Sequence, residues 1–160
     1  KPKKIAAKVA AAYKEYKTQA KARGILNYDK IPCTNHPVFK DKKVNIDPRE
    51  NYISKQFESK GIYNIFLDFY HKLVWSLYEV GASPKVFCVN IDAVIAVIAL
   101  KLMWKQYTAK EISKKEMSEI VFLVFLFARM VGVSAEIVDH LDRGTDMDCR
   151  TPASECVFVS

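Results

Sequence analysis

The sequence predicts an all-α protein, and three observations lead to this prediction. Apolar residues recur at helical spacing along most of the 160-residue chain. Hydrophobic residues make up 50% and charged residues 27%, which is typical of a globular protein and excludes a disordered one. No pair of alternating apolar and polar segments around a tight turn indicates a β-hairpin.

The first predicted helix is amphipathic and covers about residues 5–20. Lysines line one face, Gly24 is placed to end the helix, and an apolar stripe on the other face comprises Ile5, Val9, Tyr13, Tyr16 and Ala20. Residues 25–47 then contain prolines and asparagines with little periodicity. A connection of this length within a compact domain is usually functional.

Asp47 and Pro48 mark the start of the next predicted helix. An acid at the N-cap followed by proline at the first helical position is typical of a helix start. A break at Gly61 follows. A strongly apolar helix is then expected over residues 62–80, because its apolar side chains recur every three or four residues.

Residues 86–89 are expected to be extended and to lead through Asn90 and Asp92 into another apolar helix, residues 93–107. From the local sequence alone, Asp92 is most simply the N-cap of that helix. This position does not exclude catalysis, because a carboxylate at a helix N-terminus stays ionised and keeps a fixed direction.

Ser113 and Glu116 form a predicted capping box at the start of a long buried helix that continues to Val131. Gly132 is expected to break this helix, and a short helix is expected over residues 134–141.

The chain has a net charge of +7, much of it in the first 43 residues. Such a run can attract nucleic acid or an anionic surface, but a solvated lysine-rich helix face explains it equally well, and no nucleic-acid-binding motif accompanies it. The longest apolar run, residues 120–128, is far too short to span a bilayer, and no signal peptide is recognised. We therefore expect a cytoplasmic protein (or one of the mitochondrial matrix, in a eukaryote) without nucleic-acid or membrane partners.

The cysteine and histidine pattern predicts free thiols and no metal site. The three histidines are scattered, and there is no C-x-x-C pair among the four cysteines, Cys33, Cys88, Cys149 and Cys156.

Polar residues in the loops and helix ends are the candidates for a site. A histidine such as His36, between Asn35 and Pro37, is more often a turn residue than a catalyst. The alternative interpretation of Arg49 is a surface ion pair, which contributes little to stability. Arg129 lies inside an apolar helix, where an unpaired guanidinium is very costly, so it should meet a carboxylate of the protein or of a substrate.

Four segments in order resemble the citrate synthase superfamily, whose members make or break a carbon–carbon bond between an acyl-CoA and a 2-oxo acid. His36-Pro37-Val38-Phe39-Lys40, followed by Asp47-Pro48-Arg49, is similar to the family's histidine loop and its D-P-R motif. The other three are Val89-Asn90-Ile91-Asp92-Ala93, like the N-V-D segment, Phe127-Ala128-Arg129-Met130-Val131-Gly132, like a late helix, and Arg150-Thr151-Pro152 with Val157-Phe158-Val159, like the C-terminal arm. The spacing of this arm is closer to the citryl-CoA lyase module of ATP-citrate lyase than to ordinary citrate synthases.

The resemblance implies an acyltransferase or lyase acting on acetyl-CoA (or another acyl-CoA) and oxaloacetate (or another 2-oxo acid), a reaction type of the tricarboxylic acid cycle. Asp92 would exchange a proton with the acyl thioester, and His36 would polarise the carbonyl of the 2-oxo acid. A CoA thioester would be the substrate, with no permanently bound cofactor.

The binding residues implied by the resemblance are arginines and one lysine. Arg49 and Arg129 would bind the carboxylates of the substrate, and Arg150 would reach into the site of a neighbouring subunit. Lys40 occupies a position at which the family often places a basic residue near the CoA phosphates. A homodimer or higher oligomer is therefore expected.

Two departures from the family pattern are present. Cys33-Thr34-Asn35 replaces the G-x-G that precedes the histidine, and no His-Gly pair matches the family's first catalytic histidine. We therefore expect the C-terminal part of such an enzyme, completed by a complementary N-terminal chain, or a non-catalytic module that binds CoA or a partner chain. The expected parts are residues 1–29, a remnant of the large domain, 30–112, the small domain, and 113–160, the C-terminal helices and arm of the large domain.

Overall fold

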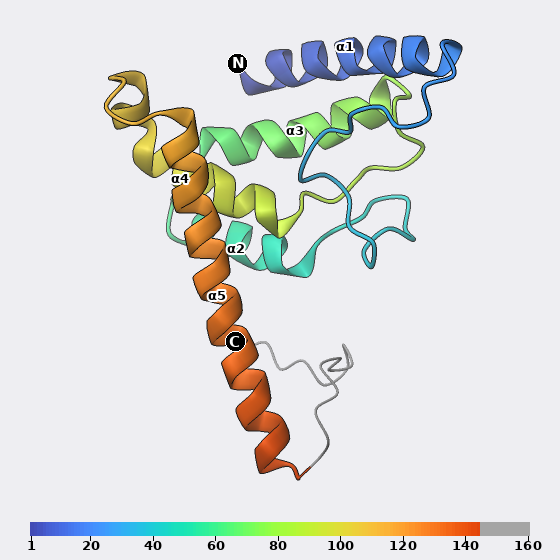
Figure 1. Ribbon diagram of the computed structural model, residues 1–160. Coiled ribbons are helices and arrows are strands. Elements are labelled where there is room, and N and C mark those ends of the chain that lie inside the picture. Colours follow the sequence, from blue (N-terminus) through green and yellow to red (C-terminus); the bar gives the residue numbers. More distant parts are fainter. Residues whose placement is uncertain (145–160) are drawn as a thin grey trace. The chain divides into compact units, whose positions relative to one another are not determined.

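The computed structural model describes residues 1–144, and these are mostly helical (Figure 1). The five helices of this part are α1 (Pro2–Ala22), α2 (Pro48–Ser59), α3 (Ile65–Glu79), α4 (Ile91–Thr108) and α5 (Lys114–Asp142). The extended segments within the described residues pair only through isolated bridges, antiparallel between Thr34 and Val89 and parallel between Val44 and Val86. The all-α prediction is confirmed, while the citrate synthase-like arrangement stays a prediction.

The chain divides into two compact units, Lys1–Met117 and Ser118–Ser160. The candidate site lies in the first of them. The expected division at residues 29 and 112 is not tested by this result and stays a prediction.

Side-chain caps set the starts of the helices in the first unit. Asp47 caps α2 by accepting a hydrogen bond from the backbone N–H of Arg49, as the sequence predicts. Asn90, not Asp92, is the N-cap of α4, because its side chain accepts the backbone N–H of Asp92 at 3.2 Å. The simplest prediction for Asp92 is therefore wrong, and this carboxylate lies in the first turn of α4, free of a capping role.

α1 lies against α3 (Figure 1), and its buried side chains are alanines. Ala6, Ala10 and Ala20 are buried, whereas Ile5, the first residue of the predicted apolar stripe, is 54% exposed. The predicted contact face of α1 is right at Tyr13, which packs against the core that α1 forms with α3, and at Ala20, which is buried. It is wrong near the N-terminus of the helix, where Ala6 is buried in place of Ile5. Small side chains let the two helix backbones approach closely, so the alanines face α3 and the larger apolar residues lie beside the contact.

A second core lies beneath the start of α4. It joins α3, α4 and the extended segment before α4, and its buried members are Leu67, Val74, Val86, Val89, Ala93, Val94 and Val97. Cys33 packs against this core from the long connection between α1 and α2. This packing places the connection next to the start of α4.

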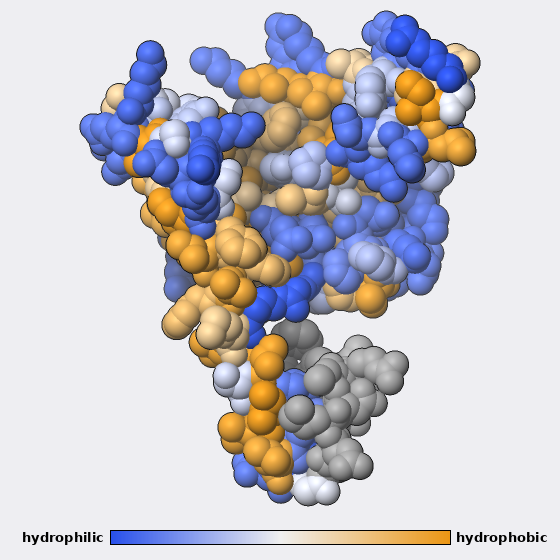
Figure 2. Space-filling view, in the orientation of Figure 1, coloured by the Kyte–Doolittle hydropathy of each residue, from blue (hydrophilic) through white to orange (hydrophobic). Residues whose placement is uncertain are grey.

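α5 is one continuous helix, so the predicted break at Gly132 is wrong. A glycine costs a helix only about 1 kcal/mol relative to alanine, and a long run of helix-forming neighbours outweighs this cost. The prediction that this helix is buried is also wrong: none of its residues is buried, and Figure 2 shows its apolar side chains at the surface.

By length and composition alone, α5 is able to cross a membrane. The longest uninterrupted apolar run, residues 120–128, is too short to span a bilayer, but the helix continues past Arg129, so the length of that run does not exclude a spanning helix. A spanning helix tolerates a single charge such as that of Arg129. Length and composition do not place a helix in a membrane, and the absence of a membrane partner stays a prediction.

Candidate functional site

The loop before His36 is held by the segment before α4. The backbone N–H of Asn35 donates to the carbonyl of Cys88 at 2.8 Å, and the N–H of Asn90 donates to the carbonyl of Cys33 at 2.9 Å. Cys33 and Asn35 have φ angles of 59° and 69°, in the left-handed region that glycine favours. The two positions that match the glycines of the citrate synthase superfamily's loop in the sequence resemblance therefore have glycine-like backbone conformations here without the glycines.

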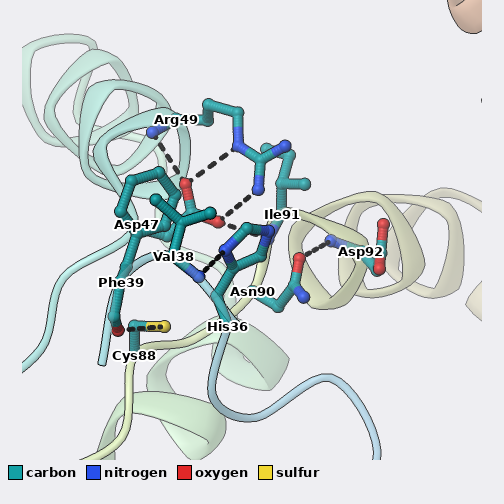
Figure 3. Close-up of polar contacts among 9 residues, drawn as sticks. All are labelled: His36, Val38, Phe39, Asp47, Arg49, Cys88, Asn90, Ile91 and Asp92. Carbon is teal, nitrogen blue, oxygen red and sulfur yellow. Dashed lines mark hydrogen bonds and ion pairs between the residues drawn. The ribbon is translucent and has the colours of Figure 1, made fainter. Parts of the chain in front are cut away.

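His36 follows this loop and stacks on Phe39, with ring centroids 4.7 Å apart and the planes inclined by 26°. Its Nδ1 accepts a hydrogen bond from the backbone N–H of Val38 at 3.2 Å (Figure 3). Because Nδ1 is the acceptor, a neutral His36 ring carries its proton on Nε2. Nε2 is then a hydrogen-bond donor for a ligand.

Arg49 is fixed by the carboxylate of Asp47 (Figure 3). Nε of Arg49 donates to Oδ1 at 3.0 Å, and Nη2 donates to Oδ2 at 2.8 Å. The guanidinium also lies 5.9 Å from the centre of the Phe39 ring, and the arginine side chain stays 36% exposed. Phe39 thus contacts both candidate groups, His36 on the one hand and Arg49 on the other.

Asp92 is exposed on the first turn of α4 (Figure 3). Its negative charge contributes to two pKa shifts in neighbouring groups. The pKa of Cys33 is raised mainly by burial and further by Asp92, and the pKa of Arg49 is raised chiefly by its bond to Asp47, with Asp92 adding to it. Asp92 is therefore within electrostatic reach of both the loop and the arginine.

Asp47 is fully buried and ionised. Burial alone opposes the charge, but hydrogen bonds from the side chain and backbone of Arg49, and the positive charge of that arginine, outweigh burial and lower the pKa of Asp47. Burial, with the charge of Asp47 adding to it, raises the pKa of Cys88 to about 11. The Cys88 thiol thus stays protonated at neutral pH and is not a nucleophile.

Three predicted binding residues remain, Lys40, Arg129 and Arg150. Lys40 is exposed in the same loop, beside a cavity of about 250 Å³ that residues 38–46 line. Arg129 is exposed on α5, in the second unit, with its guanidinium 5.1 Å from the centre of the Phe125 ring. The inference that Arg129 must meet a carboxylate is wrong in its premise, because the side chain is not buried. Arg150 lies outside the described residues.

No protein-family model matches the chain, and no curated protein or solved structure matches it either. The resemblance to the citrate synthase superfamily therefore rests on the four motifs, and the roles assigned to the site residues stay predictions.

Two contributors to the site were not predicted from the sequence as such. Phe39 was part of a motif but had no assigned role, and only the three-dimensional structure shows that it contacts two other candidates. The sequence predicts Asp47 as a helix cap but does not predict its hydrogen bonds to the side chain of Arg49. An acid two residues before an arginine at a helix start is the local signal that indicates such a pair.

Proposed function

We propose that this chain takes part in citrate synthase-type chemistry, forming or cleaving a carbon–carbon bond between an acyl-CoA and a 2-oxo acid, as the C-terminal part of the enzyme. One observation carries the proposal. His36 and Arg49 share the Phe39 ring, so that a hydrogen-bond donor and a cation lie together within electrostatic reach of the carboxylate of Asp92. The left-handed backbone at Cys33 and Asn35 supports the match to the family's glycine-containing loop.

The reaction assigns one task to each group. In the condensing direction, the carboxylate of Asp92 removes a proton from the carbon next to the thioester carbonyl. The electron pair left on that carbon attacks the carbonyl carbon of the 2-oxo acid. The Nε2–H of His36 donates a hydrogen bond that stabilises the charge developing on the carbonyl oxygen, and this oxygen takes its proton from water. The product is still a CoA thioester, and its hydrolysis by water releases CoA. Cleavage of the carbon–carbon bond in this thioester is the condensation in reverse. In both directions Arg49 binds a carboxylate of the oxo acid.

The binding alternative is supported by a different observation. Asp92 is exposed, and a solvated carboxylate is a weak base toward a carbon acid. With Asp92 in this state, the chain binds CoA or its partner without turnover. Burial of Asp92 by a substrate or by a complementary chain would convert the same residues into a catalytic site.

The test is an assay of CoA release with acetyl-CoA and oxaloacetate, using the full chain with any polypeptide that copurifies with it. Asp92→Asn and His36→Gln should each lower the rate by at least about a hundredfold, the usual contribution of a positioned acid or base. Asp41→Asn, an exposed acid of the same loop, is the matched control and should leave the rate unchanged. Wild-type rates in both site variants would refute the assignment.

Binding measurements separate the two functions. Calorimetric titration with CoA and with malonate, a small dicarboxylate, reports the binding site without chemistry. Binding of both without CoA release supports the module, and binding with release supports the enzyme. If the protein shows no binding of these ligands and no release of CoA, both proposals are refuted.

A further inference from the structure

Asp47 makes more hydrogen bonds than a helix cap requires. A cap needs only the backbone N–H of Arg49, which Oδ1 accepts at 3.0 Å. The same carboxylate also accepts from Nε and Nη2 of Arg49 and, through Oδ2, from the backbone N–H of Ile91 at 3.3 Å. Its side chain has no exposed surface. A buried charge is tolerated only when it is paired and hydrogen-bonded, and these bonds meet that condition.

We propose that Asp47 is a positioning residue that joins the two halves of the site. It fixes the guanidinium of Arg49 on α2 and, at the same time, the first turn of α4, which carries Asp92. The anchoring itself is independent of the reaction, and its effect on ligand binding rests on the proposed function.

The geometry of the guanidinium shows what this anchoring leaves for a ligand. A guanidinium has a side edge, formed by Nε and one terminal nitrogen, and an end edge, formed by the two terminal nitrogens. Asp47 occupies the side edge of Arg49. The end edge remains for a planar carboxylate, in one fixed direction, and the Phe39 ring beside the guanidinium limits its rotation.

The start of α4 is held by two side chains in succession. The first amides of a helix have no partner within the helix. Asp47 accepts the N–H of Ile91, and Asn90 accepts the N–H of Asp92. Because Asp47 lies at the start of α2, a shift of α2 against α4 would break the bond to Ile91. The separation between Arg49 and Asp92 therefore depends on Asp47.

The test uses two variants that both keep a cap on α2. In Asp47→Ser the hydroxyl still accepts the N–H of Arg49 but cannot hold the guanidinium or Ile91. In Asp47→Asn one carbonyl oxygen remains. As the cap in the position of Oδ1 it keeps the contacts with the N–H and Nε of Arg49, whereas the contacts of Oδ2 with Nη2 of Arg49 and the N–H of Ile91 are lost. Asp41→Asn is the control that removes a charge from the same loop.

Nitrogen-15 NMR follows the anchoring directly. In Asp47→Ser the solvent exchange of the Arg49 Nε proton and of the Ile91 amide should become at least about tenfold faster, since a charge-assisted hydrogen bond is worth more than the free energy of a tenfold change. In Asp47→Asn the exchange of the Ile91 amide should become faster in the same way. Asp41→Asn should leave both rates unchanged. Unchanged exchange of the Arg49 Nε proton in folded Asp47→Ser would overturn the proposal.

The affinity for malonate tests the consequence for the ligand. Asp47→Ser should weaken malonate binding by about tenfold or more. In an Arg49→Gln background the same change should have no further effect, because Asp47 then has no guanidinium to position. A further loss in that background would mean a general structural role and would overturn the proposal. If the wild-type protein binds no malonate, the proposed function fails, whereas the NMR result still decides the role of Asp47.

Discussion

The left-handed residues of the loop before His36 allow a sharp test of the site's backbone. The φ angle of Cys33 is 59°, a conformation that costs a residue with a Cβ atom about 1–2 kcal/mol. Replacing Cys33 by glycine removes this cost but adds chain entropy to the unfolded state and removes the half-buried side chain, both its carbon and its sulfur atom. A single substitution therefore does not isolate the strain.

A pair of substitutions at two neighbouring positions does isolate it. Cys33→Gly is compared with Cys33→Ala, and Thr34→Gly with Thr34→Ala. Thr34 is also half-buried but has an ordinary φ angle. The entropy of glycine and the loss of one methyl group enter both comparisons and nearly cancel. The difference between the two comparisons is then the strain alone, about 1–2 kcal/mol in favour of glycine at position 33.

Urea-induced unfolding measures this difference, because the four variants should unfold with the same dependence on denaturant. Relative to alanine, glycine should destabilise the protein at position 34 by about 0.5–1 kcal/mol and should be neutral or stabilising at position 33. Equal effects of glycine at the two positions would refute the left-handed conformation of Cys33. They would also remove the structural support that this loop gives to the family resemblance.

Three further predictions concern helix starts and the buried carboxylate. Asn64→Ala should lower the free energy of unfolding by about 2–4 kcal/mol in urea titrations. The substitution removes both the buried cap of α3 and the hydrogen bond from Nδ2 of Asn64 to the carbonyl of Val97. A loss below about 0.5 kcal/mol would show that Asn64 does not stabilise the protein in both ways. Ser113→Ala should lower the free energy of unfolding by about 1 kcal/mol in the same measurement. Glu116→Gln keeps an acceptor for the N–H of Ser113 and should lower it less. A larger loss in Glu116→Gln than in Ser113→Ala would contradict the capping box. The pKa of Asp47 is lowered by folding, so its contribution to stability is present above the ordinary aspartate value of about 3.9 and is lost as the pH falls through the folded value. Asp47→Asn should therefore flatten the decline of the urea midpoint between neutral and acidic pH, and an unchanged decline would show that other groups cause it.

The sequence predicts those parts of the fold that local contacts decide. Asp47 caps α2 as predicted, and Ser113 and Glu116 form the predicted capping box, because each of these signals acts within a few residues. The contact face of α1 is predicted at Ala20 but not near the start of the helix, since burial of Ala6 in place of Ile5 depends on how closely α3 approaches. Phe39 was missed as a contact of His36 and Arg49 for the same reason, because these residues meet only through the folding of the long connection.

Arg129 shows why a correct energetic rule gave a wrong prediction. An unpaired buried guanidinium is very costly, but the rule applies only when burial is known, and an apolar sequence does not establish burial. The side chain is exposed and lies over the ring of Phe125. Exposure removes the need for a carboxylate partner. The assignment of Arg129 to a substrate carboxylate therefore rests on the resemblance alone.

The charges of the first unit limit what it binds by itself. Arg49 is already neutralised by Asp47, and Asp92 adds a negative charge within its electrostatic reach. A dicarboxylate brings two more negative charges, so tight binding needs a second cation. Of the residues that the resemblance assigns to binding, the first unit contains Arg49 and Lys40, and Lys40 is exposed. An exposed lysine contributes little and is screened by salt. Binding to this unit alone should therefore be weak and salt-dependent, and tight binding requires that a ligand or a further polypeptide bury Asp92 and supply the missing positive charge.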